Sequence, residues 1–123
     1  TKDTMLAKAW VSLAAIYEEE ENPPKAIKYY TRLQESNPNI STYSRKLGRL
    51  YRLADSKTDA WRYYAKAYKT NPRDIKCIKG LAELAMANSQ GDLADSIIIE
   101  GLKIDSTHIG LNLLRAKLKY KVK

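Results

Sequence analysis

The sequence predicts an all-α protein built from stacked helical hairpins, and two features of the chain indicate this. Similar residues recur at a fixed distance of 34 positions along the chain. Within each period the apolar residues follow the i, i+3, i+4, i+7 spacing that places them on one face of a helix, as Trp10, Leu13, Ala14 and Tyr17 do. A single hairpin of this length cannot bury its apolar face alone, so the hairpins must stack on one another.

The 34-residue period is visible in seven columns of the sequence. We expect the small residues in these columns to let paired helices approach closely, and the bulky ones to fill the space between hairpins. The columns are Leu13, Leu47 and Leu81; Ala14, Gly48 and Ala82; Tyr17 and Tyr51; Ala26, Ala60 and Ala94; Tyr30, Tyr64 and Ile98; Asn37, Asn71 and Asp105; and Pro38 and Pro72.

Turn and capping residues divide the chain into seven expected helices. Asn22 or Pro23 marks a helix start, because proline is tolerated in the first helical turn. Asn37 and Asn71 end helices, because each precedes a proline, and Asp74 can cap the helix that follows. The expected helices span 4–20, 24–36, 41–53, 58–70, 74–88, 92–104 and 107–121.

These columns resemble the tetratricopeptide repeat (TPR) family. The family's motif places Trp, Leu, Gly and Tyr on the first helix of each hairpin and Ala, an aromatic, Ala and Pro on the second. The resemblance implies one domain over residues 1–123, a right-handed α-solenoid of three TPR-like hairpins over 7–40, 41–74 and 75–108 with a capping helix over 109–121. The third repeat carries Ala85, Gly101 and Ser106 at motif positions, and its Gly91-Asp92 turn comes two residues late, so we expect its first helix to run long.

The resemblance also implies a concave face lined by the first helix of each hairpin. Arg45, Arg49 and Arg52 share one side of such a helix, with no acidic residue between Ile40 and Ala54. The concave positions in motif register are Lys8, Val11, Ala15, Glu18, Thr42, Arg45, Arg49, Arg52, Lys76, Lys79, Glu83 and Met86, and the partner-binding residues expected among them are Arg45, Arg49, Arg52, Lys76, Lys79 and Glu83.

Two interpretations of this basic strip stay open. Arginine forks pair with carboxylates in a bidentate way, so the strip can bind an acidic peptide or the free carboxyl terminus of a partner. Alternatively, Glu18 to Glu21 pair with the arginines as an internal charge ladder, and the two interpretations are compatible. Some family members clamp a terminal carboxylate at positions that here hold Val11, Ala15, Lys46, Lys76 and Gly80. Only Lys76 matches that clamp, so we expect no chaperone-tail clamp.

A binding role is expected and an enzyme is not. Cys77 and His108 are the only cysteine and histidine, which excludes a Cys/His metal cluster, and no Gly-rich phosphate loop is present. We therefore expect no catalytic residues, no metal and no cofactor. Cys77 is expected to be a small half-buried residue, and His108 is expected at a helix cap or interface.

The net charge of +8 suits acidic partners in general, so a nucleic-acid-binding helical-repeat module is the alternative function. Most tyrosines and Trp10 occupy packing columns, which disfavours base stacking. Trp61, Tyr63 and Tyr68, with Lys66 and Lys69 beside them, are expected on the convex side. No apolar run approaches the roughly 20 residues that cross a bilayer. The chain begins at Thr1, so we expect an excerpt or a processed product, and its compartment and oligomeric state stay open.

Overall fold

The computed structural model describes residues 2–120, and these form seven α-helices with no strand among them. Every boundary within the described range lies within two residues of its expected position. Position 121, where the last helix was expected to end, lies outside that range. The helices are α1 (Lys2–Glu19), α2 (Pro23–Ser36), α3 (Ser41–Leu53), α4 (Lys57–Thr70), α5 (Ile75–Ala87), α6 (Gly91–Ile104) and α7 (Ile109–Lys119).

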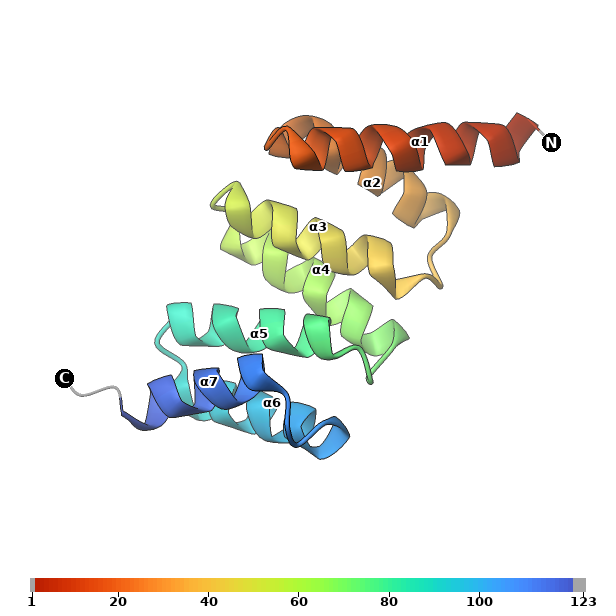
Figure 1. Cartoon of the computed structure of the whole chain (residues 1–123). Coiled ribbons are helices and arrows are strands. Elements are labelled where there is room, and N and C mark those ends of the chain that lie inside the picture. The colour runs from red at the N-terminus through yellow and green to blue at the C-terminus, as the bar shows by residue number, and fades with distance from the viewer. Residues whose placement is uncertain (1, 121–123) are drawn as a thin grey trace.

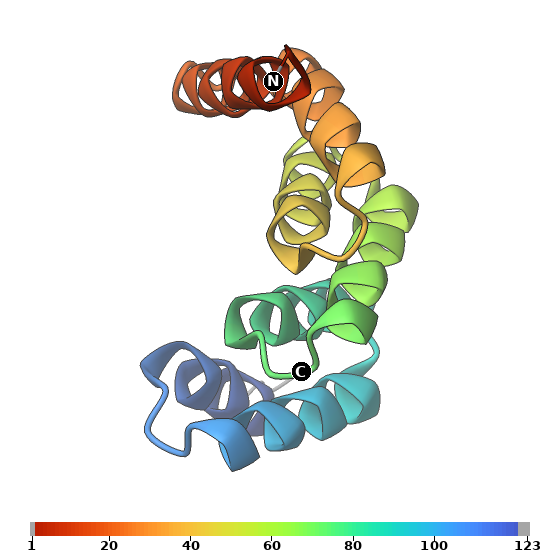
Figure 2. The ribbon, with the colours of Figure 1, turned by 90° about the vertical axis from the view of Figure 1, so that its right-hand side faces the viewer.

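The helices form three hairpins that stack into a solenoid, as the sequence predicts. Each hairpin (α1/α2, α3/α4 and α5/α6) packs on the next, and α7 closes the stack against α5 and α6 (Figure 1). The stack is curved. Figure 2 shows α1, α3, α5 and α7 along the inner side of the curve, with α2, α4 and α6 along its outer side. The inner side is therefore made by the first helix of each hairpin.

The turn inside each hairpin repeats every 34 residues in its backbone conformation as well as in its sequence. Glu21, Asp55 and Ser89 adopt left-handed φ angles of 55°, 64° and 60°. In each turn the next backbone N–H bonds back to a carbonyl five residues earlier, as Asn22 does to Tyr17 at 2.9 Å. This is the Schellman arrangement, which satisfies carbonyls at a helix end that would otherwise lack partners.

The third repeat keeps the register of the other two, so the expectation of a long first helix was wrong. The spans of α5 and α6 are those of α3 and α4 shifted by 34 residues. The reason is local: Gly91 is the first residue of α6 and does not form the turn. Ser89 supplies the left-handed residue at the place that Asp55 holds one repeat earlier.

The expected caps are present. Asn22 caps α2 by accepting a hydrogen bond from the Lys25 backbone N–H at 3.3 Å, and prolines occupy the first positions of this helix. Asp74 caps α5 in the same way through the Cys77 N–H at 3.3 Å. His108 caps α7, because its Nδ1 accepts from the Leu111 N–H at 3.1 Å. The imidazole of His108 therefore has a structural role as the N-cap of α7.

Three buried clusters run along the stack. Two lie at the junctions between successive hairpins, and the third lies between the last hairpin and α7. Tyr64 on α4 illustrates the packing between hairpins. Its ring lies over Gly48 of α3 and Gly80 of α5, so close that a Cβ at Gly48 would sit 2.8 Å from the ring. Cys77 was expected to be half-buried, but it is fully buried and donates its S–H to the Tyr64 carbonyl at 3.0 Å. Glycine at these positions thus lets a tyrosine act as the spacer between repeats.

A basic groove as the candidate functional site

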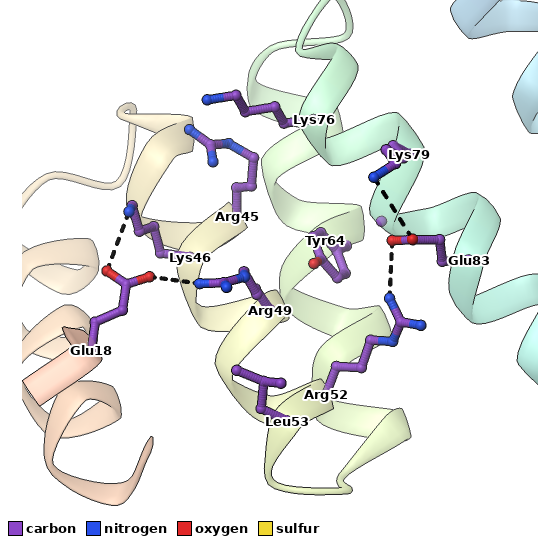
Figure 3. A pocket seen from close by; sticks show the side chains of 11 residues that line it. Glu18, Arg45, Lys46, Arg49, Arg52, Leu53, Tyr64, Lys76, Lys79 and Glu83 are labelled. Carbon is purple, nitrogen blue, oxygen red and sulfur yellow. Dashed lines mark hydrogen bonds and ion pairs between the residues drawn. The ribbon is translucent and has the colours of Figure 1, made fainter. Parts of the chain in front are cut away.

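A groove of about 740 Å³ lies on the inner side of the solenoid and is framed by α1, α3 and α5 (Figure 3). Six cationic side chains and two carboxylates line it, which leaves an excess of four positive charges. The groove brings together every site residue that the sequence predicts. Its lining consists of Glu18, Arg45, Lys46, Arg49, Arg52, Leu53, Tyr64, Lys76, Lys79, Gly80 and Glu83.

Helical spacing explains why these side chains converge. The three arginines lie at i, i+4 and i+7 on α3, so they project from one side of that helix. The 34-residue period then places Lys79 on α5 in the column of Arg45 on α3. The two basic rows face each other across the floor of the groove, which Tyr64 forms from between the helices (Figure 3).

Sequence reasoning missed part of the lining and included residues that do not belong to it. Lys46, Leu53, Tyr64 and Gly80 line the groove although they were not among the expected concave residues, and Glu18 lines it as a concave residue that was not proposed to bind the partner. Gly80 is informative in retrospect, because it is the residue whose missing side chain admits the Tyr64 ring to the floor. The expected concave residues that do not line this groove are Lys8, Val11, Ala15, Thr42 and Met86.

Ion pairs hold the side chains on the α1 side of the groove. Glu18 receives Arg49 Nη1 at 2.9 Å and Lys46 Nζ at 3.3 Å, and it also accepts the Tyr30 hydroxyl at 2.8 Å. The carboxylate is only 16% exposed, although Arg49 opposite it is 60% exposed. A well-held carboxylate thus meets a largely solvated guanidinium.

A second set of pairs joins α3 to α5. Arg45 Nε donates to Asp74 at 3.0 Å, so Asp74 caps α5 and fixes the arginine at once. Arg52 and Lys79 both approach Glu83, at 2.9 Å and 3.9 Å (Figure 3). Lys76 is exposed and has no hydrogen-bond or ion-pair partner within residues 2–120. It is the lining cation best placed to meet a ligand.

The expected charge ladder from Glu18 to Glu21 forms only at Glu18. Glu19, Glu20 and Glu21 make no ion pair with any described residue. The helix geometry accounts for this, because α1 ends at Glu19 and only Glu18 shares the face that meets α3. The remaining arginines instead pair with Asp74 and Glu83, which the sequence pattern does not connect with them.

The surroundings of Glu18 and Tyr64 alter their pKa values. Partial burial raises the pKa of Glu18, but the Tyr30 hydrogen bond and the charges of Lys46 and Arg49 outweigh burial and lower it overall. Burial raises the pKa of Tyr64 to about 12, so its hydroxyl is neutral at physiological pH. The basic side chains of the groove and its neutral phenol can therefore bind anionic groups by charge and hydrogen bonding.

The part of the chain that the structure describes contains few side chains suited to metal binding or nucleophilic chemistry. No set of three or more His, Cys, Asp or Glu side chains between residues 2 and 120 is arranged to hold a metal. Burial raises the pKa of Cys77 to about 12, which leaves its thiol protonated and shielded. No described helix is long and apolar enough to cross a membrane.

The aromatic residues considered for stacking on nucleic-acid bases mostly contact one another or basic side chains. Tyr51 and Tyr63 stack at 5.4 Å between ring centroids, and Tyr17 and Tyr29 repeat this pair one period earlier. Arg62 covers the Tyr63 ring at 4.6 Å. Tyr63 is thus buried, whereas it was expected on the convex surface.

Comparison with solved structures finds close matches for the whole arrangement. The Arabidopsis OM64 TPR domain superposes with a TM-score of 0.86 over 94% of this chain and 96% of that domain, at 12% identity. The chain has the tetratricopeptide repeat fold. The TPR2B domain of yeast Sti1, solved as a complex with pHsp70, gives a TM-score of 0.85 over 96% of this chain and 99% of that domain, at 16% identity.

A third TPR domain matches equally well. The second TPR domain of human RPAP3, in complex with the HSP70 peptide SGPTIEEVD, gives a TM-score of 0.85 over 94% of this chain and 97% of that domain, at 14% identity. No family model and no curated protein sequence matches the chain. The resemblance noted in the repeat columns is therefore confirmed at the level of the fold.

Proposed function

We propose that the chain is a non-catalytic protein-interaction module that binds an acidic peptide segment of a partner protein in the basic groove. The observation that carries this proposal is the charge of the groove, where six cationic side chains outnumber two carboxylates. Lys76 is unpaired among the described residues and Arg49 is 60% exposed, so both can reach a ligand without first breaking a buried contact.

The TPR fold gives the proposal a precedent. The human RPAP3 domain holds a peptide, SGPTIEEVD, with three acidic residues near its end. The terminal-carboxylate clamp of the family is mostly missing here, because Val11, Ala15 and Gly80 occupy clamp positions. We therefore assign recognition to acidic side chains along a peptide and not to a free carboxyl terminus.

Fluorescence anisotropy tests this assignment with a labelled hexaglutamate peptide whose C-terminus is amidated. We expect binding that weakens as salt is raised, because exposed ion pairs are screened. Arg49→Gln should lower the affinity several-fold. The matched control is Arg62→Gln on the outer helix α4, since Arg62 is 59% exposed and also holds one ion pair. Equal losses in the two variants would contradict a groove site.

Lysine variants give a second test of the same groove. Lys76→Gln should weaken hexaglutamate binding without changing the urea midpoint, because Lys76 has no partner among residues 2–120 to lose. Lys69→Gln on the outer side is its control. Single-stranded oligothymidylate addresses the nucleic-acid alternative. DNA binding that is tight and insensitive to Arg49→Gln would favour that alternative.

A further inference from the structure

The first helix carries an apolar stripe that residues 2–120 cover only in part. Leu6, Ala9, Leu13 and Ile16 lie at i, i+3, i+7 and i+10 and so share one side of α1. The side chains of Leu6 and Ile16 are 50% and 47% exposed. We call this set the open stripe. Isolated exposed apolar residues are ordinary, but a row of them along one helix marks an interaction surface.

The 34-residue period shows what the open stripe corresponds to. Leu13 and Ile16 fall in the columns of Leu47 and Leu50 on α3, which are 0% and 2% exposed. One repeat later the same columns hold Leu81 and Leu84 on α5, which are 6% and 1% exposed. In the first repeat Ile16 is 47% exposed and Leu13 is only partly buried, so the same positions are buried in both later repeats and more exposed in the first.

A helix of the preceding hairpin buries these columns in the later repeats. Leu47 and Leu50 belong to the cluster that contains Ala26, Tyr30 and Leu33 of α2. The next junction repeats this arrangement on α4, whose residues in that cluster are Ala60, Tyr64 and Ala67. Each covering helix thus presents a small residue, then a tyrosine four positions later, then an apolar residue three positions after that.

The composition of the open stripe differs from that of a cap. Terminal repeats of a solenoid need polar outer faces to stay soluble. All four residues of the open stripe are apolar, so its composition is that of a junction.

We propose that the open stripe is a junction for one more hairpin, whose second helix docks on α1 as α2 docks on α3. The fit follows from continuity with the junctions already present, because the stripe repeats their leucine columns. The partner helix carries the face of α2 and α4, with a small residue, a tyrosine and an apolar residue at i, i+4 and i+7. Its site is separate from the basic groove.

An extended protein tests the junction directly. A copy of residues 41–74 replaces residues 1–6 directly before Ala7, which keeps the 34-residue period and places the α4 sequence against α1. Leu6 is lost in this protein, whereas Ala9, Leu13 and Ile16 of the open stripe remain. We expect the urea midpoint of the single unfolding transition to rise, because stacked repeats stabilise one another. An appended hairpin that unfolds separately at low urea would overturn the proposal.

A substitution inside the open stripe distinguishes docking of the added hairpin on α1 from a general effect of lengthening the chain. Ile16→Ser should shift the urea midpoint at least three times more in the extended protein than in the natural one. Val11→Ser is the matched control, because Val11 is 43% exposed on the same helix but lies in the Arg45 column. It should have the same small effect in both proteins. Equal effects of Ile16→Ser in the two proteins would also overturn the proposal.

Sedimentation velocity of the natural protein decides whether the occupant is instead a second copy. We expect a monomer across the accessible concentration range, because two identical stripes lack the tyrosine that fills the junction. A dimer that Ile16→Ser abolishes and Val11→Ser leaves intact would make the second copy the occupant and refute the assignment to a hairpin.

Discussion

Replacing Glu18 with glutamine should lower the stability of the fold and raise the affinity of the groove for acidic ligands. The carboxylate of Glu18 accepts the Tyr30 hydroxyl at 2.8 Å and pairs with Arg49 and Lys46. Glutamine keeps the shape of the side chain and an oxygen for Tyr30. It removes the negative charge, so the two cations lose their partner while the hydrogen bond from α2 is retained.

The contacts of Glu18 set the size of the effect. Hydrogen bonds to charged groups contribute about 1.5–3 kcal/mol when they are shielded. The side chains of Arg49 and Lys46 are 60% and 33% exposed, so solvent screens both pairs and reduces this value. We expect Glu18→Gln to lower the free energy of unfolding by about 1 kcal/mol at pH 7.

The pH dependence of this loss has a definite sign. The pKa of Glu18 in the folded protein is lower than its ordinary value of 4.5, so folding favours the charged carboxylate. The stability from that charge is complete above pH 4.5 and is lost as the pH falls through the lowered folded pKa. The difference in stability between the natural protein and Glu18→Gln should therefore be smaller at a pH below the lowered folded pKa than at pH 7.

Urea denaturation at the two pH values measures the stability, and anisotropy with hexaglutamate measures the binding. Glu18→Gln frees Arg49 and Lys46 from an internal competitor, so affinity should rise several-fold while stability falls. Unchanged or weaker binding would refute the competition and show that Glu18 mainly positions Arg49. A stability difference that is equal at both pH values would refute the electrostatic explanation of the pKa shift.

Three further outcomes follow from the packing. Gly80→Ala should lower the free energy of unfolding by about 1–3 kcal/mol in urea, because its Cβ would clash with the Tyr64 ring, whereas Gly91→Ala, with only a 3.7 Å contact, should be close to neutral. Glu21→Gly should raise the thermal midpoint and stabilise by up to about 1 kcal/mol, since it relieves a left-handed φ of 55°, and a fall would contradict this. Cys77 is buried and its pKa is raised to about 12. An aromatic disulfide reagent should therefore label its thiol only after the protein is unfolded in urea. Rapid labelling of the folded protein would show that the thiol is accessible.

Much of the fold could be predicted from the sequence because the information is local and repeated. Capping by Asn22 and Asp74 depends on residues within one turn of each, so it could be recognised from neighbouring letters. The exception was the Gly91-Asp92 turn, which resembled a displaced motif. The backbone there keeps the common register because Ser89 adopts the left-handed conformation, which is uncommon for serine.

Only those features of the candidate site that follow from helix periodicity could be predicted. The spacing of Arg45, Arg49 and Arg52 placed them on one face, and the period added Lys79, so their convergence in one groove was expected. The acidic residues that pair with these basic side chains were not expected, apart from Glu18. The pairs that fix Arg45 and Arg52 join residues 29 and 31 positions apart.

The sequence by itself determined the helices, the hairpins and the faces that pack, because each depends on spacing along one direction of the polypeptide. Only the tertiary structure decided the state of the groove, including the pairing of Arg52 with Glu83 and the freedom of Lys76 among the described residues. It also decided that the α1 stripe is open, since burial depends on whether a neighbouring hairpin is in place. The angle and distance at which successive hairpins stack set these contacts, and they arise from the packing of side chains such as Tyr64 between glycines.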